Sequence, residues 1–405
     1  MTPPRRIVVV GASAAGLTAA ESLRADGFDG ELTVVGSEPH LAYDRPPLSK
    51  QLLAGAWAAD RLELLPRDRY DDLSIGCRLG AAATALDVAG RTVRVGGSDG
   101  DGDGVDGVEL GFDRLLIATG VRPRTWPGTD GLRGVHVLRT LDDTVAFKAA
   151  AHDAGRVVVI GAGFLGAEAA ATLRGLGIDV TLVDPSPAPM LRQVGPVVAG
   201  LLADLHAEHG VDLRLGRSVA AIERDGDRVT GVRLDDGARF ATTCVLVAIG
   251  TTPATEWLAG SGLDLADGVG CDAWCRAAPG VFAAGDVARW FHRGRGASLR
   301  VEHRTNATEQ AMAAARAMLD PGDPYEPVPY VWSDQYDTKL QTYGETTATD
   351  RFAVISGSID ERRFVALYGR AERVVGALGW RSPRELLRAR ALVADGVPWS
   401  EAVAA

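Results

Sequence analysis

Cysteine is scarce in this chain, which has four among its 405 residues. Cys77, Cys244, Cys271 and Cys275 form neither a C-x-x-C pair nor a set with the spacing of a metal site. Cys271 and Cys275 lie in a stretch that is typical of a strand and a turn, where two ordinary thiols are expected. The sequence therefore predicts no metal site and no redox-active disulfide.

Long apolar runs and an excess of basic charge are also missing. No segment approaches the roughly 20 apolar residues that span a membrane, and the short apolar run near the N-terminus is followed by no signal-peptide cleavage site. Lys and Arg number 43 against 53 Asp and Glu, so the formal net charge of −10 argues against nucleic acid as a partner. We expect a cytoplasmic protein with neither a membrane nor a nucleic-acid partner.

Glycine, in contrast, is plentiful, and two glycine-rich motifs share one plan. The first is VVVGASAAGLTAAESL at residues 8–23 and the second is VVVIGAGFLGAEAAATL at residues 157–173. Each combines an apolar strand, a tight turn and a helix rich in Ala and Leu. The glycines let the backbone approach a pyrophosphate, whose charge is met by the free N–H groups and the dipole of the helix N-terminus.

The turn of the first motif contains a serine at the position where a second glycine is usual. Its residues are Gly11, Ser13, Ala14, Ala15 and Gly16. Glu38 follows at the end of the next expected strand, 27 residues after Gly11, where a carboxylate reaches the ribose hydroxyls of an adenosine.

The second motif has glycine at all three positions, and its residues are Gly161, Gly163, Phe164, Leu165 and Gly166. Asp184 ends the next expected strand, 23 residues after Gly161. A carboxylate there accepts hydrogen bonds from both ribose hydroxyls of NAD and repels the 2′-phosphate of NADP. Arg192 is close enough in sequence to weaken this preference.

Two such motifs, each with an acid at ribose distance, imply two dinucleotides and therefore electron transfer between nicotinamide and flavin. We predict an α/β fold with two Rossmann-like domains and a small α+β domain at the C-terminus. The expected FAD domain comprises residues 1–120 and 246–320, the NADH domain residues 121–245, and the C-terminal domain residues 321–405.

The remaining segments are less regular. Residues 79–118 and 213–249 alternate like β-meanders, and residues 297–319 favour a helix. The C-terminal domain is expected to hold two or three strands and a basic helix from about Pro383. The run that contains Asp99, Asp101 and Asp103 resembles the start of an EF-hand loop, but position twelve is Leu110, so we expect a hairpin tip without calcium.

Six features give the chain a resemblance over nearly its full length. They are the first glycine motif with Glu38, YDRPPLSK (43–50), ATG (118–120), GAGFLGAE (161–168), AAGDV (283–287) and WSDQY (332–336), of which YDRPPLSK and WSDQY are the most diagnostic. With them the chain resembles the FAD-dependent NADH:ferredoxin reductases of bacterial oxygenase systems, which have a glutathione-reductase-like fold. Where many of those proteins carry tryptophan, this chain has Arg304.

The resemblance implies roles for further residues. Arg45 and Lys50 would lie against the phosphates and the isoalloxazine, and Asp286 would bind the ribityl and pyrophosphate region. Trp332 would pack near the flavin edge or serve only as a core residue. Other residues expected at the cofactors are Ala118, Thr119, Gly120, Arg122, Gly250 and Gly285.

The catalytic pair implied by the resemblance is Lys50 with Glu168, close to flavin N5. A buried lysine needs a counter-ion, and its positive charge would favour the reduced, anionic flavin. A purely structural ion pair is the alternative.

NADH would thus reduce FAD, and the electrons would leave singly to a 2Fe–2S ferredoxin and from it to an oxygenase. Rubredoxin reductase, or an NADH-responsive flavin-binding redox sensor, is the alternative function. Arginines 289, 293, 295, 300 and 304 could form a docking surface for an acidic ferredoxin, or they could only solvate a loop. The sequence does not indicate the oligomeric state.

Overall fold

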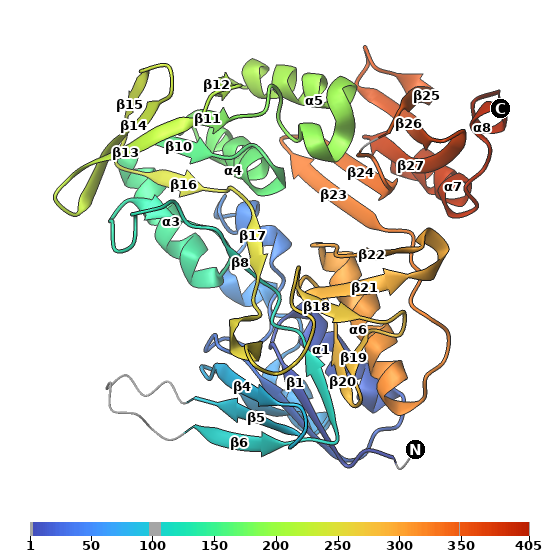
Figure 1. The fold of residues 1–405 in the computed structure, drawn as a ribbon. Helices are drawn as coiled ribbons and strands as arrows, with labels where there is room; N and C mark the ends of the chain where they lie inside the picture. The colour runs from blue at the N-terminus through green and yellow to red at the C-terminus, as the bar shows by residue number, and fades with distance from the viewer. Residues whose placement is uncertain (1–2, 97–106, 348, 405) are drawn as a thin grey trace. The chain divides into compact units, whose positions relative to one another are not determined.

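The structure, a computed structural model, describes residues 3–96, 107–347 and 349–404 and divides into two compact units. Unit 1 comprises Met1–Asp44, Asp60–Arg122 and Thr252–Pro327, and unit 2 comprises Arg45–Ala59, Pro123–Thr251 and Val328–Ala405. The chain passes between the units near β8 (Val121–Pro123) and β17 (Thr251–Pro253) (Figure 1). Each unit contains one of the two glycine-rich motifs.

Unit 1 is built on a six-stranded sheet that is parallel except at one edge. The strand order is β19 (Arg276–Ala278), β20 (Val281–Ala283), β7 (Arg114–Ile117), β1 (Arg6–Val10), β2 (Glu31–Val35) and β3 (Gly76–Arg78). β1 lies at the centre, pairs in parallel with β2 and β7, and leads directly into the first glycine motif. Such parallel strands are buried on both faces, which explains the continuous apolar run of β1.

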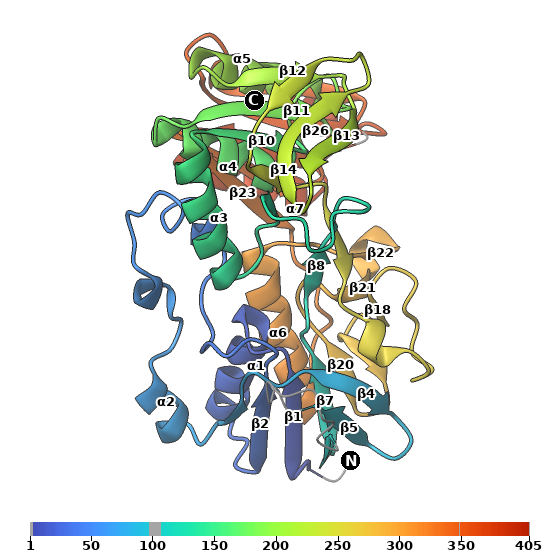
Figure 2. The ribbon, with the colours of Figure 1, turned by 90° about the vertical axis from the view of Figure 1, so that its left-hand side faces the viewer.

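Both faces of this sheet are covered. Ile7 and Val9 contact the side of α1 (Ala14–Ala25) and α6 (Arg304–Leu319), two helices that pack against each other (Figure 2). Val8 and Val10 contact the meander on the other face. That meander consists of β4 (Ala83–Asp87), β5 (Thr92–Val95) and β6 (Val108–Gly111).

Smaller elements complete unit 1. A three-stranded sheet contains β18 (Val269–Cys271), β21 (Ala288–His292) and β22 (Ala297–Leu299). The short helices are α2 (Arg67–Asp72), η2 (Ala59–Leu62), η3 (Glu256–Leu258) and η4 (Arg293–Arg295).

Unit 2 repeats the same plan with a five-stranded parallel sheet. The strand order is β12 (Asp212–Leu215), β11 (Asp179–Asp184), β10 (Arg156–Ile160), β16 (Val245–Val247) and β9 (Val135–His136). Helices α3 (Leu141–Ala154) and α4 (Phe164–Gly175) contact this sheet. Val158 and Ile160 instead face the meander of β13 (Val219–Asp225), β14 (Arg228–Leu234) and β15 (Arg239–Ala241). The short helix η1 (Pro46–Ser49) contacts α3 and α4.

The C-terminal part of unit 2 is a five-stranded antiparallel sheet. Its order is β23 (Tyr330–Gln335), β24 (Thr338–Gly344), β27 (Arg373–Trp380), β26 (Arg363–Arg370) and β25 (Arg351–Ser358). α5 (Leu191–Glu208) packs on one face through side chains such as Val198 and Leu202, which cluster with Phe364 and Trp380. α7 (Pro383–Ala394) and α8 (Trp399–Ala404) pack on the other face.

The predicted α/β fold class with its α+β C-terminal part is confirmed, but two element predictions are wrong. The helix expected from residue 297 begins at Arg304, because Ala297–Leu299 pairs antiparallel with β21 and His303 is extended. The C-terminal sheet has five strands where two or three were expected. Some of these strands alternate only weakly between apolar and polar residues, and they are defined by pairing with their neighbours. The division into three domains stays a prediction; its boundaries at 120 and 246 lie close to Arg122 and Thr252.

Two further expectations concern absent features. Within residues 3–96, 107–347 and 349–404, no helix has the length and apolar character needed to cross a membrane. Over the same ranges no group of three or more His, Cys, Asp or Glu side chains is placed to hold a metal ion. The run that resembles an EF-hand loop lies outside the described residues.

Candidate dinucleotide and flavin sites

In unit 1 the turn of the first motif has two positions, Gly11 and Gly16, at which no side chain larger than hydrogen fits. Gly11 has a φ of +123°, and a Cβ there would lie 2.1 Å from the Ala118 carbonyl oxygen. A Cβ on Gly16 would lie 1.8 Å from the Gly11 carbonyl oxygen. The backbones of β1, β7 and the start of α1 therefore pack closely at these glycines. The N-terminus of α1 lies next to the turn.

The entry to α1 fits an anion. Ser13 is the N-cap residue, and the first turn consists of the uncharged residues Ala14, Ala15, Gly16 and Leu17. Backbone N–H groups without intrahelical partners are available there, as a pyrophosphate requires. Glu38 is half-buried beyond β2, and the Tyr43 hydroxyl donates a hydrogen bond to its carboxylate, a contact that the sequence did not suggest.

The other residues expected at the flavin in unit 1 lie on neighbouring turns. Ala118 and Thr119 follow β7, where the Ala118 N–H donates to the Val10 carbonyl (2.7 Å) and the Thr119 hydroxyl to the Ala254 carbonyl (2.9 Å). Gly285, which follows β20, has a φ of +79°. Its N–H donates to Gln310 Oε1 at 2.9 Å.

Beside this turn, a Cβ on Gly285 would lie 3.2 Å from the Cβ of Ala15, so the AAGDV turn closely approaches the start of α1. Gly120 is also left-handed, at φ +68°. Asp286 is half-buried beside Gly285. Gln310, completely buried in α6, is a supporting residue that sequence reasoning missed.

Arg122 and Arg304, two residues that the sequence analysis singled out in unit 1, each form an ion pair with an acid. Arg122 is 62% exposed, and its Nη2 lies 3.4 Å from Glu256 Oε2. Arg304, at the position where the resemblance leads us to expect tryptophan, places its Nε 2.6 Å from Asp44 Oδ1. The ion pair of Arg304 therefore joins the start of α6 to Asp44, the second residue of the YDRPPLSK motif.

In unit 2 the second motif forms a turn of the same build. Gly161 has a φ of +104°, and a Cβ there would lie 2.3 Å from the Ala248 carbonyl oxygen, while one on Gly166 would lie 1.9 Å from the Gly161 carbonyl oxygen. Gly163 is different: a Cβ there would meet Gln193 Nε2 only at 4.0 Å. Space is thus left above the N-terminus of α4, which Phe164 and Leu165 begin, and this fits a second dinucleotide.

Asp184 ends β11 and holds the same turn in place. Its Oδ2 accepts from the Ala162 N–H and its Oδ1 from the Ser186 N–H, each at 2.7 Å. Both oxygens keep further lone pairs that can accept from ribose hydroxyls. Arg192 is exposed, and another basic residue, Arg217, donates its backbone N–H to the Asp184 carbonyl at 3.2 Å.

Lys50 and Glu168 form an ion pair within unit 2. Lys50 follows η1, Glu168 lies in the second turn of α4, and the ammonium lies 2.6 Å from Glu168 Oε2. The two side chains are 12% and 8% exposed. Lys50 also donates to the Pro46 carbonyl at 3.0 Å, and the Ser49 hydroxyl donates to the same Oε2 at 2.7 Å.

The other carboxylate oxygen of Glu168 leads into the C-terminal sheet. The hydroxyl of Ser333, on β23, donates to Glu168 Oε1 at 2.8 Å, and Gln335 Nε2 lies 3.1 Å from the Ser333 hydroxyl. Beyond Gln335 lie His206 of α5 and Tyr336. Sequence reasoning treated WSDQY as a diagnostic motif but missed that its serine and glutamine contact Glu168.

The remaining expected residues of unit 2 are separate from this cluster. A guanidinium nitrogen of Arg45 donates to the Arg139 carbonyl. Trp332 is half-buried and stacks on Tyr330, with ring centroids 5.8 Å apart. Gly250 is exposed at φ +94°.

The four cysteines, all within the described residues, are free thiols. Burial raises the pKa of Cys244 to about 12 and raises that of Cys275 well above its usual value. Since the thiolate is the reactive form, these two thiols are poor nucleophiles at neutral pH.

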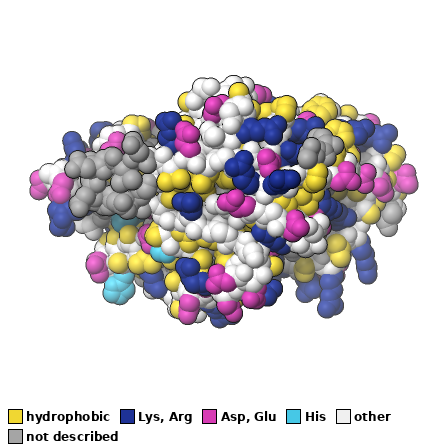
Figure 3. Space-filling view, turned by 90° about the horizontal axis from the view of Figure 1, so that it is seen from below, with side chains coloured by type: hydrophobic (Ala, Val, Ile, Leu, Met, Phe, Trp, Pro, Cys, Tyr) yellow, Lys and Arg dark blue, Asp and Glu magenta, His cyan; other side chains and the backbone are white. Residues whose placement is uncertain are grey.

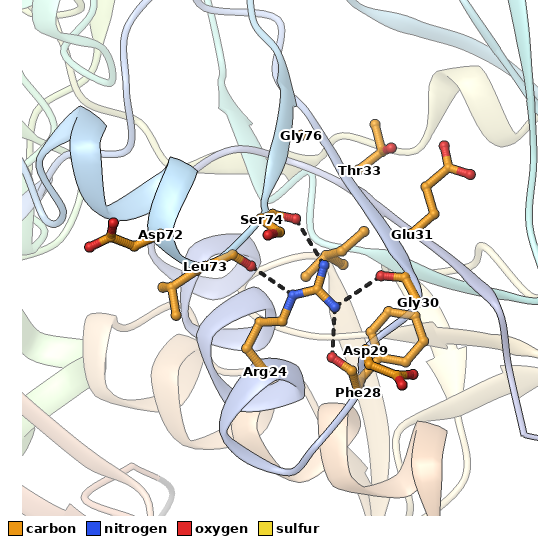
Figure 4. Close-up of a pocket in the computed structure, with 11 residues that line it drawn as sticks. Arg24, Phe28, Asp29, Gly30, Glu31, Thr33, Asp72, Leu73, Ser74 and Gly76 are labelled. Atoms are coloured by element: carbon orange, nitrogen blue, oxygen red, sulfur yellow. Dashed lines mark hydrogen bonds between the residues drawn. The ribbon is translucent and has the colours of Figure 1, made fainter.

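Unit 1 also has an open hollow of about 740 Å³ around Arg24, shown in Figure 4. The guanidinium donates to the carbonyls of Leu73, Phe28, Gly30 and Ser74, at 2.6–2.9 Å. An arginine with its donors committed to backbone oxygens joins α1 to the loops around it. We therefore interpret this hollow as part of the packing of unit 1.

Comparisons with known proteins give matches over almost the whole chain. Residues 5–311 match the family described as pyridine nucleotide-disulphide oxidoreductase, and residues 330–405 match the one described as reductase C-terminal.

Two curated relatives are similar over at least nine-tenths of their own length. The ferredoxin reductase subunit of 5,5'-dehydrodivanillate O-demethylase from Sphingobium sp. is 37% identical over 394 residues, which cover 96% of this chain and 93% of that protein. Rhodocoxin reductase from Rhodococcus erythropolis is 34% identical, covering 97% and 90%. Among solved structures, the reductase in the covalent putidaredoxin reductase–putidaredoxin complex matches with a TM-score of 0.90 at 33% identity, covering 97% and 94%.

Proposed function

The chain belongs to the pyridine nucleotide-disulphide oxidoreductase family, and from that premise we propose that it passes electrons from NADH through FAD to a 2Fe–2S ferredoxin that serves an oxygenase. The observation that carries the proposal is the pair of glycine turns, one in each unit. Each brings a helix N-terminus above a backbone turn that excludes a Cβ, and each has an acid nearby, Glu38 in unit 1 and Asp184 in unit 2.

We assign FAD to unit 1 and NADH to unit 2. The flavin, when bound, supplies the chemistry that converts a two-electron donor into a one-electron donor. The chain would supply binding and electrostatics: Asp184 would accept from the ribose of NADH. The resemblance assigns Lys50 to the flavin, where its positive charge would favour the negative, reduced form. Glu168 keeps that ammonium in one position by its 2.6 Å contact.

Support for a ferredoxin as the electron acceptor comes from the relatives. One is a ferredoxin reductase subunit of an O-demethylase, and the reductase of the solved complex is joined to putidaredoxin. The free thiols argue in the same direction, because a disulfide reductase passes electrons through a pair of cysteines beside the flavin. We place the activity in the cytoplasm, where NADH is supplied.

The test is anaerobic reduction followed by electron transfer. Purified protein should carry one non-covalent FAD, and excess NADH should bleach its absorbance within the mixing time of a conventional spectrophotometer. A 2Fe–2S ferredoxin added next should be reduced catalytically, with many turnovers per flavin.

The matched control is a rubredoxin under the same conditions, which should be reduced much more slowly. Preferential reduction of the rubredoxin would replace the proposed partner. A bleached flavin that persists in contact with NAD and passes electrons to neither carrier would make the protein a redox sensor.

A further inference from the structure

A continuous series of hydrogen bonds connects Glu168 with a buried histidine of α5. It runs from Glu168 through Ser333 and Gln335 to His206, with donor–acceptor distances of 2.8, 3.1 and 2.9 Å. His206 Nδ1 lies 2.9 Å from the Tyr336 hydroxyl. Ser333, Gln335 and His206 are 0–2% exposed, so this path is shielded from water.

The position of each hydrogen in this path follows from one premise, that Glu168 is ionised beside Lys50. A carboxylate only accepts, so Ser333 must give its single hydroxyl hydrogen to Glu168 Oε1 and can only accept from Gln335. Gln335 therefore directs its NH₂ group to Ser333, and the same group faces Met190 Sδ at 3.2 Å. The reversed amide would place its oxygen against an acceptor.

The rest of the path is then determined as well. Gln335 Oε1 faces His206 and only accepts, so the hydrogen of the neutral imidazole lies on Nε2. His206 Nδ1 is then an acceptor, and the Tyr336 hydroxyl donates to it. All donors thus point the same way, toward the carboxylate of Glu168.

We propose that His206 is a positioning residue for the Lys50–Glu168 pair, acting through Gln335 and Ser333. Each hydrogen bond in an aligned series polarises the next, which strengthens the last one. The Ser333 hydroxyl therefore binds Glu168 Oε1 more firmly than an isolated serine would, and the carboxylate is held against rotation away from the ammonium. The inference rests on the proposed function, in which Lys50 acts on the flavin.

The backbone at Tyr336 supports this reading. Tyr336 and Asp337 form the two-residue turn between β23 and β24, and Tyr336 has a φ of +53°, where Asn or Gly is usual. Its ring stacks on His209, with centroids 3.7 Å apart, while its hydroxyl contacts His206. A bulky residue in this conformation is retained where its side-chain contacts compensate for the strain.

The first test reads the hydrogen positions directly in the intact protein. Histidine labelled with ¹⁵N gives distinct imidazole shifts for the two tautomers, and the signal of His206 is assigned by its loss in His206→Gln. We expect a neutral ring protonated at Nε2 from pH 6 to 8. A ring protonated at Nδ1 would overturn the proposal, whether or not the protein reduces a ferredoxin, so this outcome is separate from the fate of the proposed function.

The second test compares variants of the FAD-loaded protein. His206→Met removes the donor at similar size, and His206→Gln retains an N–H near the Nε2 position. We expect His206→Met to slow flavin reduction by NADH about fivefold and to shift the flavin midpoint potential, with an unchanged KM for NADH. His206→Gln should have a reduction rate and a midpoint potential close to those of the wild type. If His206→Met fails to fold, Ser333→Ala interrupts the same path with a smaller change and should give the same effect.

The control is Tyr368→Phe, which removes another buried tyrosine hydrogen bond of unit 2, the 2.6 Å contact with the Val194 carbonyl. It should destabilise unit 2 without altering the potential or the reduction rate. The proposal is overturned if His206→Met and Ser333→Ala keep the wild-type potential, or if Tyr368→Phe shifts it equally.

Discussion

At the scale of single residues, the Lys50–Glu168 contact is the interaction on which the proposed chemistry most depends. Its two side chains are 12% and 8% exposed, so removing one partner leaves the other charge poorly solvated. We predict that Lys50→Met or Glu168→Gln slows flavin reduction by NADH while FAD stays bound. Each should also destabilise the protein by about 3–5 kcal/mol, the usual effect of breaking a buried pair.

The double variant tests whether these losses have a common origin. Because neither charge remains, Lys50→Met with Glu168→Gln should cost less than the sum of the two single changes, in stopped-flow reduction and in chemical denaturation alike. Strict additivity in both measurements would show that the 2.6 Å contact contributes nothing.

Asp184 supports a second prediction at this scale, on coenzyme preference. Wild-type protein should prefer NADH, since a carboxylate close to a 2′-phosphate is repulsive. Asp184→Asn should lower the ratio of kcat/KM for NADH to that for NADPH about tenfold, the factor that corresponds to about 1.4 kcal/mol. It keeps one oxygen that can accept from Ala162 or Ser186, so the glycine turn should survive.

Asp184→Ala is the informative comparison, because it removes both acceptors and should weaken the binding of both coenzymes. Equal use of NADH and NADPH by the wild type would mean that a basic residue such as Arg217 overrides the carboxylate. Arg217 Nε lies 3.3 Å from Asp236 Oδ2, an ion pair that reduces its availability for a phosphate.

At the scale of elements, two glycines of the second turn should affect different properties. Gly161 should determine the stability of unit 2, and Gly163 should determine its affinity for NADH. Gly161→Ala would place a Cβ 2.3 Å from the Ala248 carbonyl at a φ of +104°, so it should destabilise unit 2 by more than about 2 kcal/mol. Gly163→Ala meets its nearest neighbour at 4.0 Å, at a φ of −73° that alanine accepts. It should change the free energy of unfolding by less than about 1 kcal/mol.

The two substitutions should also differ in NADH binding, measured by fluorescence titration. The methyl group of Gly163→Ala occupies the space into which the pyrophosphate is expected to fit, so the Kd for NADH should rise about tenfold or more. Unchanged affinity in a folded Gly163→Ala protein would place the coenzyme elsewhere.

The elements that the sequence predicts well are those with a strict local pattern. The strand and helix around each glycine motif are such cases, because Gly11 and Gly161 are required by turns that local spacing already defines. The start of α6 at Arg304 was missed, since it depends on the pairing of Ala297–Leu299 with β21. The contact between Ser333 and Glu168 joins residues 165 positions apart, and no local pattern encodes it.

At the scale of the whole molecule, His206 links protonation to stability. Burial lowers its pKa to about 4, against a usual value of 6.5, and the hydrogen bond to Gln335 opposes this shift in part. The other groups near it are His209, which caps the C-terminus of α5, Tyr336 at the hairpin, and Arg174 of α4, which acts on Tyr336. His206 is therefore neutral in the folded protein at neutral pH.

The stability of unit 2 should therefore fall as the pH is lowered. Between pH 6.5 and 4 the unfolded chain binds a proton at His206 that the folded protein does not, so stability falls as the pH is lowered through this window. The loss should approach about 3 kcal/mol for unit 2, measured by urea unfolding at pH 7 and pH 4.5. His206→Gln should flatten this slope. An equal slope in that variant would mean that other groups cause the acid sensitivity.

The distribution of charged residues determines where an acidic ferredoxin could dock. The net charge of −10 opposes an acidic partner overall, and one face of the molecule shows basic and acidic side chains side by side (Figure 3). In the expected arginine cluster, Arg289 pairs with Asp264, Arg300 with Asp267 and Glu302, and Arg304 with Asp44. The charges of these three arginines are thus largely neutralised. This weakens the prediction that all five arginines form a docking surface for ferredoxin.

Arg293 and Arg295 of η4 are the two members of the cluster that we choose for charge reversal; Arg293 is exposed and Arg295 half-buried. Arg293→Glu with Arg295→Glu should raise the apparent KM for ferredoxin several-fold and flatten its dependence on ionic strength, while NADH-to-ferricyanide activity is retained. The matched variant is Arg384→Glu with Arg388→Glu on α7, where Leu387 between them is 62% exposed. If only the α7 variant changes ferredoxin kinetics, the carrier docks on the C-terminal part of unit 2 and not at η4.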